Sequence, residues 1–182
     1  GRFSASGDLV LRANPAGAIL FAGLAYRLPY RFDTARQMES AALMAGLGVA
    51  ANGAFVQGGP FVEWMPVLPL QLRLQYDVYG FSGANGSLLS FPSAGSAFGT
   101  AAMDARAGTE EATYAQRALL RPTLRLKLGR VVVRSQTDLA HYRLNGEGPY
   151  SFEREYDTLL QQHDWIRSSR TGLTIVSNPG QP

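Results

Sequence analysis

The stretch LQLRLQYDVY at residues 70–79 decides the fold class, because apolar and polar side chains alternate in it. The even-numbered positions carry leucine, tyrosine or valine, whereas the odd-numbered positions carry glutamine, arginine, aspartate or tyrosine. A period of two is typical of a β-strand, in which successive side chains point to opposite faces. The sequence therefore predicts a strand with one apolar and one largely polar face.

The same alternation returns twice in the second half of the chain. From Leu120 to Leu128, leucines and a proline alternate with arginine, threonine and lysine. After Gly129 and Arg130, a second alternating stretch runs over residues 131–140. Each stretch is about twice the mean length of a strand in a globular protein, which is about 5–6 residues. The sequence thus indicates a sheet of unusually long strands.

Turn signals divide the rest of the chain into further strands. Asn-Gly pairs begin at Asn52, Asn85 and Asn145, and these residue types favour turns that need a positive φ. Short connections are expected at residues 14–17, 52–53, 67–69 and 129–130. Eight strands are expected at residues 4–13, 18–30, 41–51, 54–66, 70–81, 114–128, 131–144 and 156–176, the last long enough to be two strands joined near Ser168.

Residues 34–47 leave two interpretations open, helix or strand. A threonine and a glutamine at capping-box spacing, followed by many Ala, Leu and Met residues, favour a helix. Gly46, Gly48 and the Asn-Gly turn that follows fit a strand of small residues better. The stretch Glu110–Leu120 could likewise start as a helix, and two helices would favour a soluble α+β domain.

Composition excludes several classes of protein. Hydrophobic residues make up 46% of the 182 residues and the net charge is only +3, so intrinsic disorder is not expected. No apolar run reaches the roughly 20 residues that a membrane helix needs. Cysteine is absent, which excludes a disulfide framework and a thiolate metal site. Because the basic residues do not cluster in one run, nucleic acid is not an expected partner.

A long strand with a continuous apolar face must bury that face somewhere, and in a membrane barrel the face meets lipid. On the stretches at 70–79 and 120–140, the rhythm of short turns and long loops, and the aromatics near strand ends, the chain resembles a bacterial outer-membrane β-barrel. The resemblance implies an all-β fold, an antiparallel up-and-down transmembrane β-barrel with about eight strands in this chain. It also implies the outer membrane of a Gram-negative bacterium as the location and membrane lipid as a partner.

We expect residues 1–182 to form a single β-barrel domain, with long loops at 82–113 and 145–155 that are extracellular by the family resemblance. Barrels of this kind usually end on a strand that closes with an aromatic residue, whereas this chain ends at Pro182. We therefore expect the chain to be a fragment of a longer protein and its strands to be part of a larger barrel.

The polar face of the expected strands carries the candidate functional residues. In a barrel this face lines the lumen, so the resemblance implies a passive porin-like channel or a structural membrane protein with a charged, Arg-rich lumen. Such charges pair across a small barrel, whereas in a larger one they favour a small anionic solute. The expected lumen-lining residues are Arg73, Gln75, Asp77, Arg121, Arg125, Lys127, Arg134 and Asp138.

Aromatic residues near strand ends are expected at the membrane interface, where such barrels carry aromatic girdles. The residues assigned to this interface are Tyr26, Tyr30, Trp64 and Tyr142. For Trp64, the alternative is a core tryptophan of a soluble sheet, since both placements share one periodicity.

Two other functions remain as alternatives. A soluble β-barrel binding module for an apolar ligand would turn the leucines inward. A membrane lipid hydrolase is conceivable because His163 is close in sequence to Ser168 and Ser169, but no G-x-S-x-G motif is present. We expect no enzyme activity, no cofactor and no metal site, and we expect the acidic residues Glu153 and Glu155 to be solvated in a loop.

Overall fold

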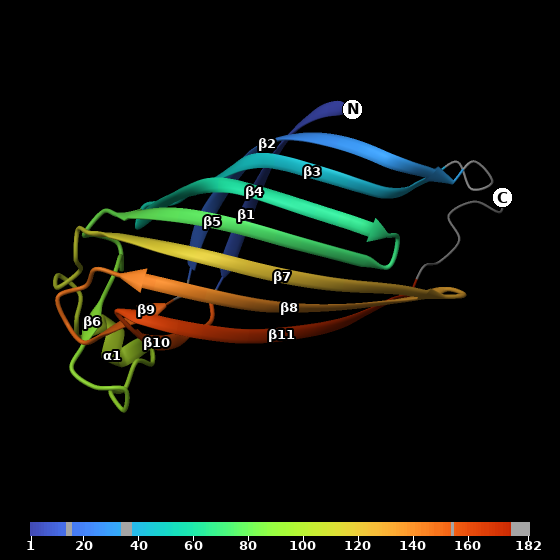
Figure 1. Ribbon diagram of the computed structural model, residues 1–182. Coiled ribbons are helices and arrows are strands. Elements are labelled where there is room, and N and C mark those ends of the chain that lie inside the picture. Colours follow the sequence, from blue (N-terminus) through green and yellow to red (C-terminus); the bar gives the residue numbers. More distant parts are fainter. Residues whose placement is uncertain (14–15, 34–37, 154, 176–182) are drawn as a thin grey trace.

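The computed structural model describes residues 1–13, 16–33, 38–153 and 155–175 of the chain. The fold is all-β, with 72% strand and 3% helix. Eight strands form one antiparallel sheet (Figure 1). These strands are β1 (Arg2–Ala13), β2 (Ala16–Asp33), β3 (Met38–Ala51), β4 (Phe55–Val67), β5 (Leu70–Phe81), β7 (Tyr114–Leu128), β8 (Val131–Leu144) and β11 (His163–Ile175).

The strands are neighbours in the sheet in the order in which they follow along the chain. This meander confirms the prediction of an antiparallel all-β fold, and all eight strands overlap the expected ranges. The eight strands do not close into a barrel, because β1 and β11 are the two edges of the sheet among the described residues. Closure would need these edges to pair with each other or with additional strands.

A small second sheet and a short helix gather at one end of the large sheet (Figure 1). The sheet has the order β10-β9-β6, with β6 at Ser90–Phe91, β9 at Tyr150–Glu153 and β10 at Thr158–Gln161. The helix α1 spans Thr100–Asp104. We call residues 82–113 and 145–162 the cap, its end of the large sheet the cap end, and the opposite end the turn end.

The cap has a small hydrophobic core of its own. Leu89, Phe91 and Phe152 are buried there, and Phe98 packs against them. A backbone hydrogen bond from Phe152 N to Leu89 O, 3.0 Å long, ties its two segments together. The two long connections therefore form a folded unit rather than the two loops that the sequence predicts.

The strand bounds decide the segments that the sequence left open. Residues 38–51 form strand β3, the alternative that Gly46 and Gly48 favour, whereas a helical start in Glu110–Leu120 is wrong, because this stretch contains the start of β7. The last expected strand divides between β10 and β11, at Gln162, and Ser168 lies within β11. The capping-box residues Thr34 and Gln37 lie outside the described residues.

Turn chemistry sets the register of the hairpins. Gly129 has a φ of +61° in the two-residue turn between β7 and β8, a conformation that glycine adopts without strain. Asn52 closes the turn between β3 and β4, because its Oδ1 accepts hydrogen bonds from the backbone N–H of Ala54 and Phe55, both at 2.8 Å. The Asn-Gly signal at Asn85 also marks a turn, with a φ of 55°.

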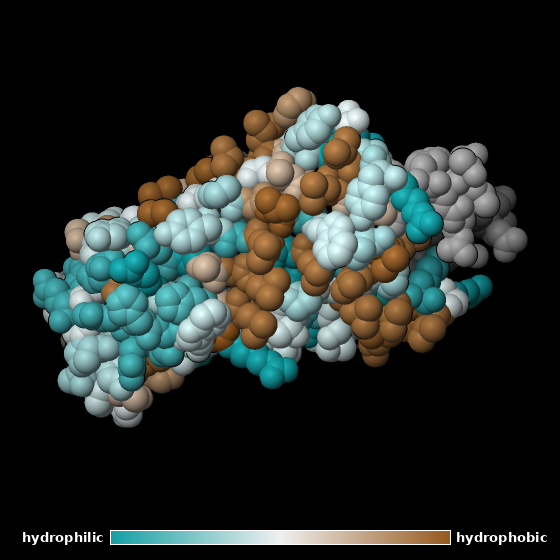
Figure 2. All heavy atoms as spheres, viewed as in Figure 1, coloured by the Kyte–Doolittle hydropathy of each residue, from teal (hydrophilic) through white to brown (hydrophobic). Residues whose placement is uncertain are grey.

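The large sheet has two chemically different faces. From β2 to β7 the outer face is exposed and largely apolar, and 59% of Leu47 and 58% of Leu74 are exposed. Figure 2 shows hydrophobic residues spread over the strands and hydrophilic residues gathered at the cap end. The inner face carries the buried residues, including a core cluster of Tyr79, Leu119, Ala140, Tyr142 and Leu160, the last of which comes from the cap. No helix among the described residues is long and apolar enough to cross a membrane.

Candidate functional site on the inner face

The residues predicted to line a lumen lie on one face of three adjacent strands. Arg73, Gln75 and Asp77 are on β5. The strand register places Arg73 opposite Arg121, and Arg125 opposite Arg134. The period-two pattern thus brings these side chains to the same face, as the alternation of the sequence predicts.

At the cap end, a buried ion pair joins β5 to β7. Arg117 donates from Nη2 to Asp77 Oδ2 at 2.7 Å and from Nε to the same oxygen at 3.1 Å. The side chains are only 4% and 1% exposed. Arg117 was absent from the predicted set, although it shares the parity of Arg121 and that signal was available.

A second ion pair lies one step farther along the same face. Arg121 donates from Nε to Asp138 Oδ1 at 2.6 Å and from Nη2 to Oδ2 at 3.0 Å, which makes a bidentate contact. Arg170 of the edge strand β11 donates to the same Oδ2 at 3.3 Å, and Gln136 to Oδ1 at 3.2 Å. Asp138 therefore connects three strands.

Arg73 extends this network toward β4. Its Nε donates to Gln75 Oε1 at 2.9 Å, and Gln75 in turn donates to Asp77 Oδ1 at 2.7 Å. Its Nη1 lies 3.7 Å from Glu63 Oε2, and its guanidinium carbon lies 4.0 Å from the ring centroid of Phe61. Because Glu155 of the cap contacts both Arg117 and Arg121, the network runs from β4 to β11.

The cap contributes acidic side chains to this face. Glu155 accepts a hydrogen bond from Arg117 and lies 3.8 Å from Arg121 Nη2. The hydroxyl of Tyr156 donates to Asp138 Oδ2 at 3.3 Å. Glu153 accepts from the hydroxyl of Tyr142 at 3.3 Å and from the backbone N–H of Tyr156 at 2.8 Å. The expectation of a solvated loop residue is therefore wrong for Glu153, which is half-buried in β9, whereas Glu155 is exposed in a turn and pairs with the arginines.

Burial changes the acidity of two of these cap groups. Burial raises the pKa of Glu153 to about 7, and the hydrogen bond from the Tyr156 N–H opposes that shift. Burial also raises the pKa of the Tyr156 hydroxyl, and the nearby carboxylate of Glu155 acts in the same direction. Glu153 can therefore exchange a proton near neutral pH.

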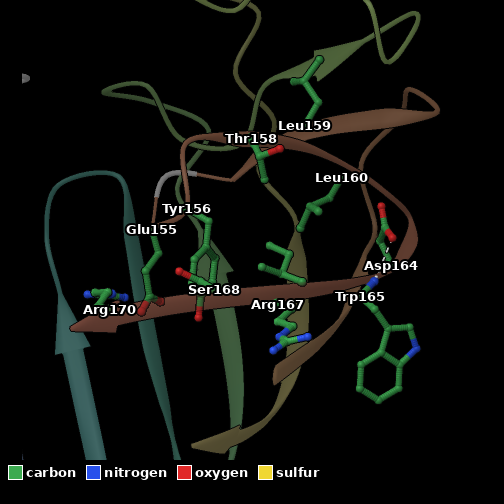
Figure 3. Close-up of a pocket in the computed structure, with 11 residues that line it drawn as sticks. Glu155, Tyr156, Thr158, Leu159, Leu160, Asp164, Trp165, Arg167, Ser168 and Arg170 are labelled. Atoms are coloured by element: carbon green, nitrogen blue, oxygen red, sulfur yellow. Dashed lines mark hydrogen bonds between the residues drawn. The ribbon is translucent and has the colours of Figure 1, made fainter. Parts of the chain in front are cut away.

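A pocket of about 570 Å³ lies between the cap and the edge strand β11. Figure 3 shows Glu155 and Tyr156 reaching from the segment between β9 and β10 toward β11, which carries Ser168 and Arg170. Leu159 and Leu160 form an apolar part of its wall. The arrangement can bind polar or charged groups, and it holds no nucleophile activated by a base within the described residues.

At the turn end, the inner face is exposed and basic. Arg125, Lys127 and Arg134 are all exposed there. Arg125 and Arg134 lie directly opposite each other, an arrangement of like charges that is unfavourable unless anions or water screen it. Arg134 donates to Gln136 at 2.9 Å, and no ion pair joins these three bases to a carboxylate in the described part of the chain.

Three of the four predicted interface aromatics are exposed on the outer face. Tyr26, Tyr30 and Trp64 are exposed, and Trp64 Nε1 donates to the hydroxyl of Tyr30 at 2.9 Å. Tyr142 differs from the prediction, because it is 2% exposed and lies on the inner face beside Arg117. Its position in β8 has the parity of Asp138, so the alternation itself contradicts an outward placement.

The histidine and serine residues do not form a hydrolytic site. His163 and Ser168 have opposite parity in β11 and therefore point to opposite faces of the sheet. The hydroxyl of Ser169 is hydrogen-bonded to that of Thr137 at 3.0 Å. No group of His, Asp or Glu residues with the arrangement of a metal site occurs within the described ranges.

No protein-family model matches the chain, and comparisons with the curated proteins and with the solved structures find no match.

Proposed function

We propose that this chain forms a wall of an outer-membrane β-barrel, with the outer face on lipid and the inner face lining a porin-like passage. The barrel is a passive channel rather than an enzyme. Its charged inner face selects small anionic solutes, and the cap narrows the passage at one end. Closure of the barrel takes place through the two edge strands, either with each other or with further strands.

The observation that carries this proposal is the exposed apolar outer face. Strands β3, β4 and β5 have 14, 13 and 12 residues. A tilted strand needs about 9–11 residues to cross a bilayer, so each of them is long enough. Exposed leucines over several adjacent strands are unfavourable in water, whereas lipid removes that penalty. Because unpaired backbone groups are costly in lipid, the open edges of β1 and β11 must be paired there.

The turn-end bases support selection of anions. Arg125, Lys127 and Arg134 present three positive charges on one face, and rings of Arg or Lys favour anions in pores. At the cap end, by contrast, the arginines are neutralised by Asp77, Asp138 and the cap carboxylate Glu155. A passing anion therefore meets its strongest attraction near the turn end.

The soluble binding module fits these surfaces less well. That function needs the leucines to enclose a ligand, whereas Leu47 and Leu74 are exposed and the cap covers the charged face instead. The opposite orientations of His163 and Ser168 argue against a lipid hydrolase. The membrane barrel is thus the function that these residues favour.

The test is ion conductance of the refolded chain in a planar bilayer with a salt gradient. The proposal predicts discrete conductance steps and a reversal potential with the sign of anion preference. The variant Arg125→Gln/Arg134→Gln should shift that potential toward zero, because two of the exposed bases are removed. Insertion without conductance would leave a structural membrane protein, and failure to insert would overturn the membrane assignment altogether.

A further inference from the structure

The outer face of β8 and β11 differs from the outer face of the strands before them. Outward positions of β4, β5 and β7 carry no charged residue. At the cap end of β8 and β11, by contrast, basic and aromatic residues share the outer face. The residues of this basic patch are His141, Arg143, His163, Trp165 and Arg167.

Strand register brings the members of the basic patch together. His163 lies opposite Arg143, and Trp165 lies opposite His141. The ring centroids of His141 and Trp165 are 4.9 Å apart, and those of His141 and His163 are 6.5 Å apart. Arg167 follows Trp165 at the next outward position, opposite Leu139. The five side chains therefore form one continuous surface.

The basic patch is exposed and has no acidic counterpart. Trp165 is 71% exposed, and Arg143 and Arg167 are also exposed. No carboxylate occupies an outward position of β8 or β11, and Asp164 has the opposite parity to Trp165. Among the described residues, neither Arg143 nor Arg167 forms an ion pair. Two unpaired guanidinium groups thus face outward beside an indole ring.

This combination is matched to one kind of partner. An indole at the end of a membrane strand lies at the level of the lipid headgroups, and arginines there reach the same level along their aliphatic stems. A phosphate accepts paired hydrogen bonds from a guanidinium, and anionic lipids attract basic residues near the surface. Farther from the cap, the outer face carries the paired hydroxyls of Thr137 and Ser169 and of Ser135 and Thr171, and it becomes apolar at Val133 and Leu173.

We propose that the basic patch of β8 and β11 is a binding site for a lipid with an anionic phosphate headgroup, in the leaflet at the cap end. This inference rests on the proposed membrane function and adds a preferred lipid to it. Arg143 and Arg167 bind the phosphate, and Trp165 packs along the lipid at the depth of the glycerol and upper acyl chain. The apolar outer faces of β4, β5 and β7 have no such preference.

The test uses the two tryptophans of the chain as separate reporters. The variant Trp64→Phe leaves Trp165 in the basic patch, and Trp165→Phe leaves Trp64 near the turn end. Each variant is refolded into vesicles that mix phosphatidylcholine with phosphatidylglycerol, one of the two carrying brominated acyl chains that quench tryptophan. The quenching gives the relative affinity of each site for the anionic lipid.

Trp165 should report a preference for brominated phosphatidylglycerol of between about fivefold and about 25-fold, because each arginine contributes about a factor of five at an anionic surface. Adding Arg143→Gln/Arg167→Gln should reduce the preference to near one. The matched control Arg125→Gln/Arg134→Gln removes the same charge from the inner face and should leave the preference unchanged. Trp64 should report a value near one throughout.

Two results would overturn the lipid site. If Trp165 shows no preference in protein that floats with the vesicles, the lipid site is wrong while the membrane barrel stands. If the control removes the preference as fully as the patch variant, the preference comes from overall charge and not from the patch. Protein that fails to float with vesicles of either composition would overturn the proposed function, and the lipid site with it.

Discussion

The two faces of the same strands follow the same period of two, but they differ in which side chains are buried. On the outer face of β7, Leu124 and Leu126 are exposed, whereas on its inner face Arg117 is buried and paired with Asp77. In a water-soluble sheet these burial states would be reversed. The difference supports the proposal that lipid covers the outer face, and it shows that the cap end of the inner face pairs its buried charges.

The largest effect is expected from breaking the inner face at its buried ion pair. Arg117→Met leaves the carboxylate of Asp77 buried without its partner, which costs about 3–5 kcal/mol of unfolding free energy. The measurement is the urea midpoint of the refolded protein. The double variant Arg117→Met/Asp77→Asn should recover most of the loss, and Arg125→Met, at an exposed base, should cost little. An equal loss in Arg117→Met and Arg125→Met would contradict the pairing.

The next effect comes from breaking the outer face. Leu126→Arg places a charge on the outer face of β7, which is proposed to face the bilayer, and this costs about 2–4 kcal/mol at mid-depth. The expected outcome is a reduced fraction of protein that folds into phosphatidylcholine vesicles from urea. The control is its neighbour in sequence, because Arg125→Ala on the inner face should reduce the folded fraction far less. Comparable losses in the two variants would remove the distinction between the faces.

A pH series sharpens the comparison where the cap meets the inner face. Because burial raises the pKa of Glu153 to about 7, the protonated carboxyl is the form that the folded cap favours. The contribution of this carboxyl to the stability of the folded cap is complete below about pH 4.5, which is the ordinary pKa of a glutamate. That contribution is lost as the pH rises through 7. The size of the change is on the order of 3 kcal/mol.

Hydrogen exchange of the Phe152 amide, corrected for intrinsic rates, measures this change. Protection should fall between about pH 5 and about pH 8 in the natural sequence, and Glu153→Gln should flatten the profile. Glu147→Gln changes an exposed cap carboxylate and should leave the profile as it is. A profile that keeps its slope in Glu153→Gln would assign the pH dependence to another group.

The smallest effect concerns an outer-face contact at the turn end. Tyr30→Phe removes a hydroxyl that accepts from Trp64 Nε1 at 2.9 Å and donates to Met65 O at 3.3 Å, and each such hydrogen bond contributes about 0.5–1.5 kcal/mol. The urea midpoint should fall slightly and Trp64 emission should change. Tyr26→Phe removes a hydroxyl with no hydrogen-bond partner in the described residues, so the urea midpoint and the Trp64 emission should not change. A larger effect from Tyr26→Phe would contradict this contact.

Period-two alternation is a local property, and it was enough to predict the strands. The alternation at 70–79 predicted β5 to the residue at its start, and the glycines of 38–51 pointed correctly to a strand. Gly46 shows why small residues are needed there, since a Cβ would overlap the carbonyl oxygen of Leu24 on β2. Helix propensity in that segment was overridden by the pairing of β3 with both neighbours.

The cap depends on contacts that no local pattern encodes. Glu155 pairs with Arg117 across 38 residues of sequence, and Phe152 packs with Phe91 in a core made by two separate segments. A short polar stretch rich in Gly and Glu has the composition of a solvated loop, so its folding onto the inner face was missed. Tyr142 differs from the prediction for another reason: a position near a strand end favours the membrane interface, whereas its parity in β8 places it on the inner face.

The most direct test of the account is a cysteine scan over residues 124–128 of β7. The chain has no native cysteine, so each variant carries one thiol. In vesicles, a water-soluble thiol reagent should label residues 125 and 127, whereas 124, 126 and 128 should be protected and should be labelled by a lipid-soluble reagent. That alternation would establish the leucine face as the lipid face. Uniform labelling by the water-soluble reagent, or protection of 125 and 127 instead, would contradict the membrane barrel.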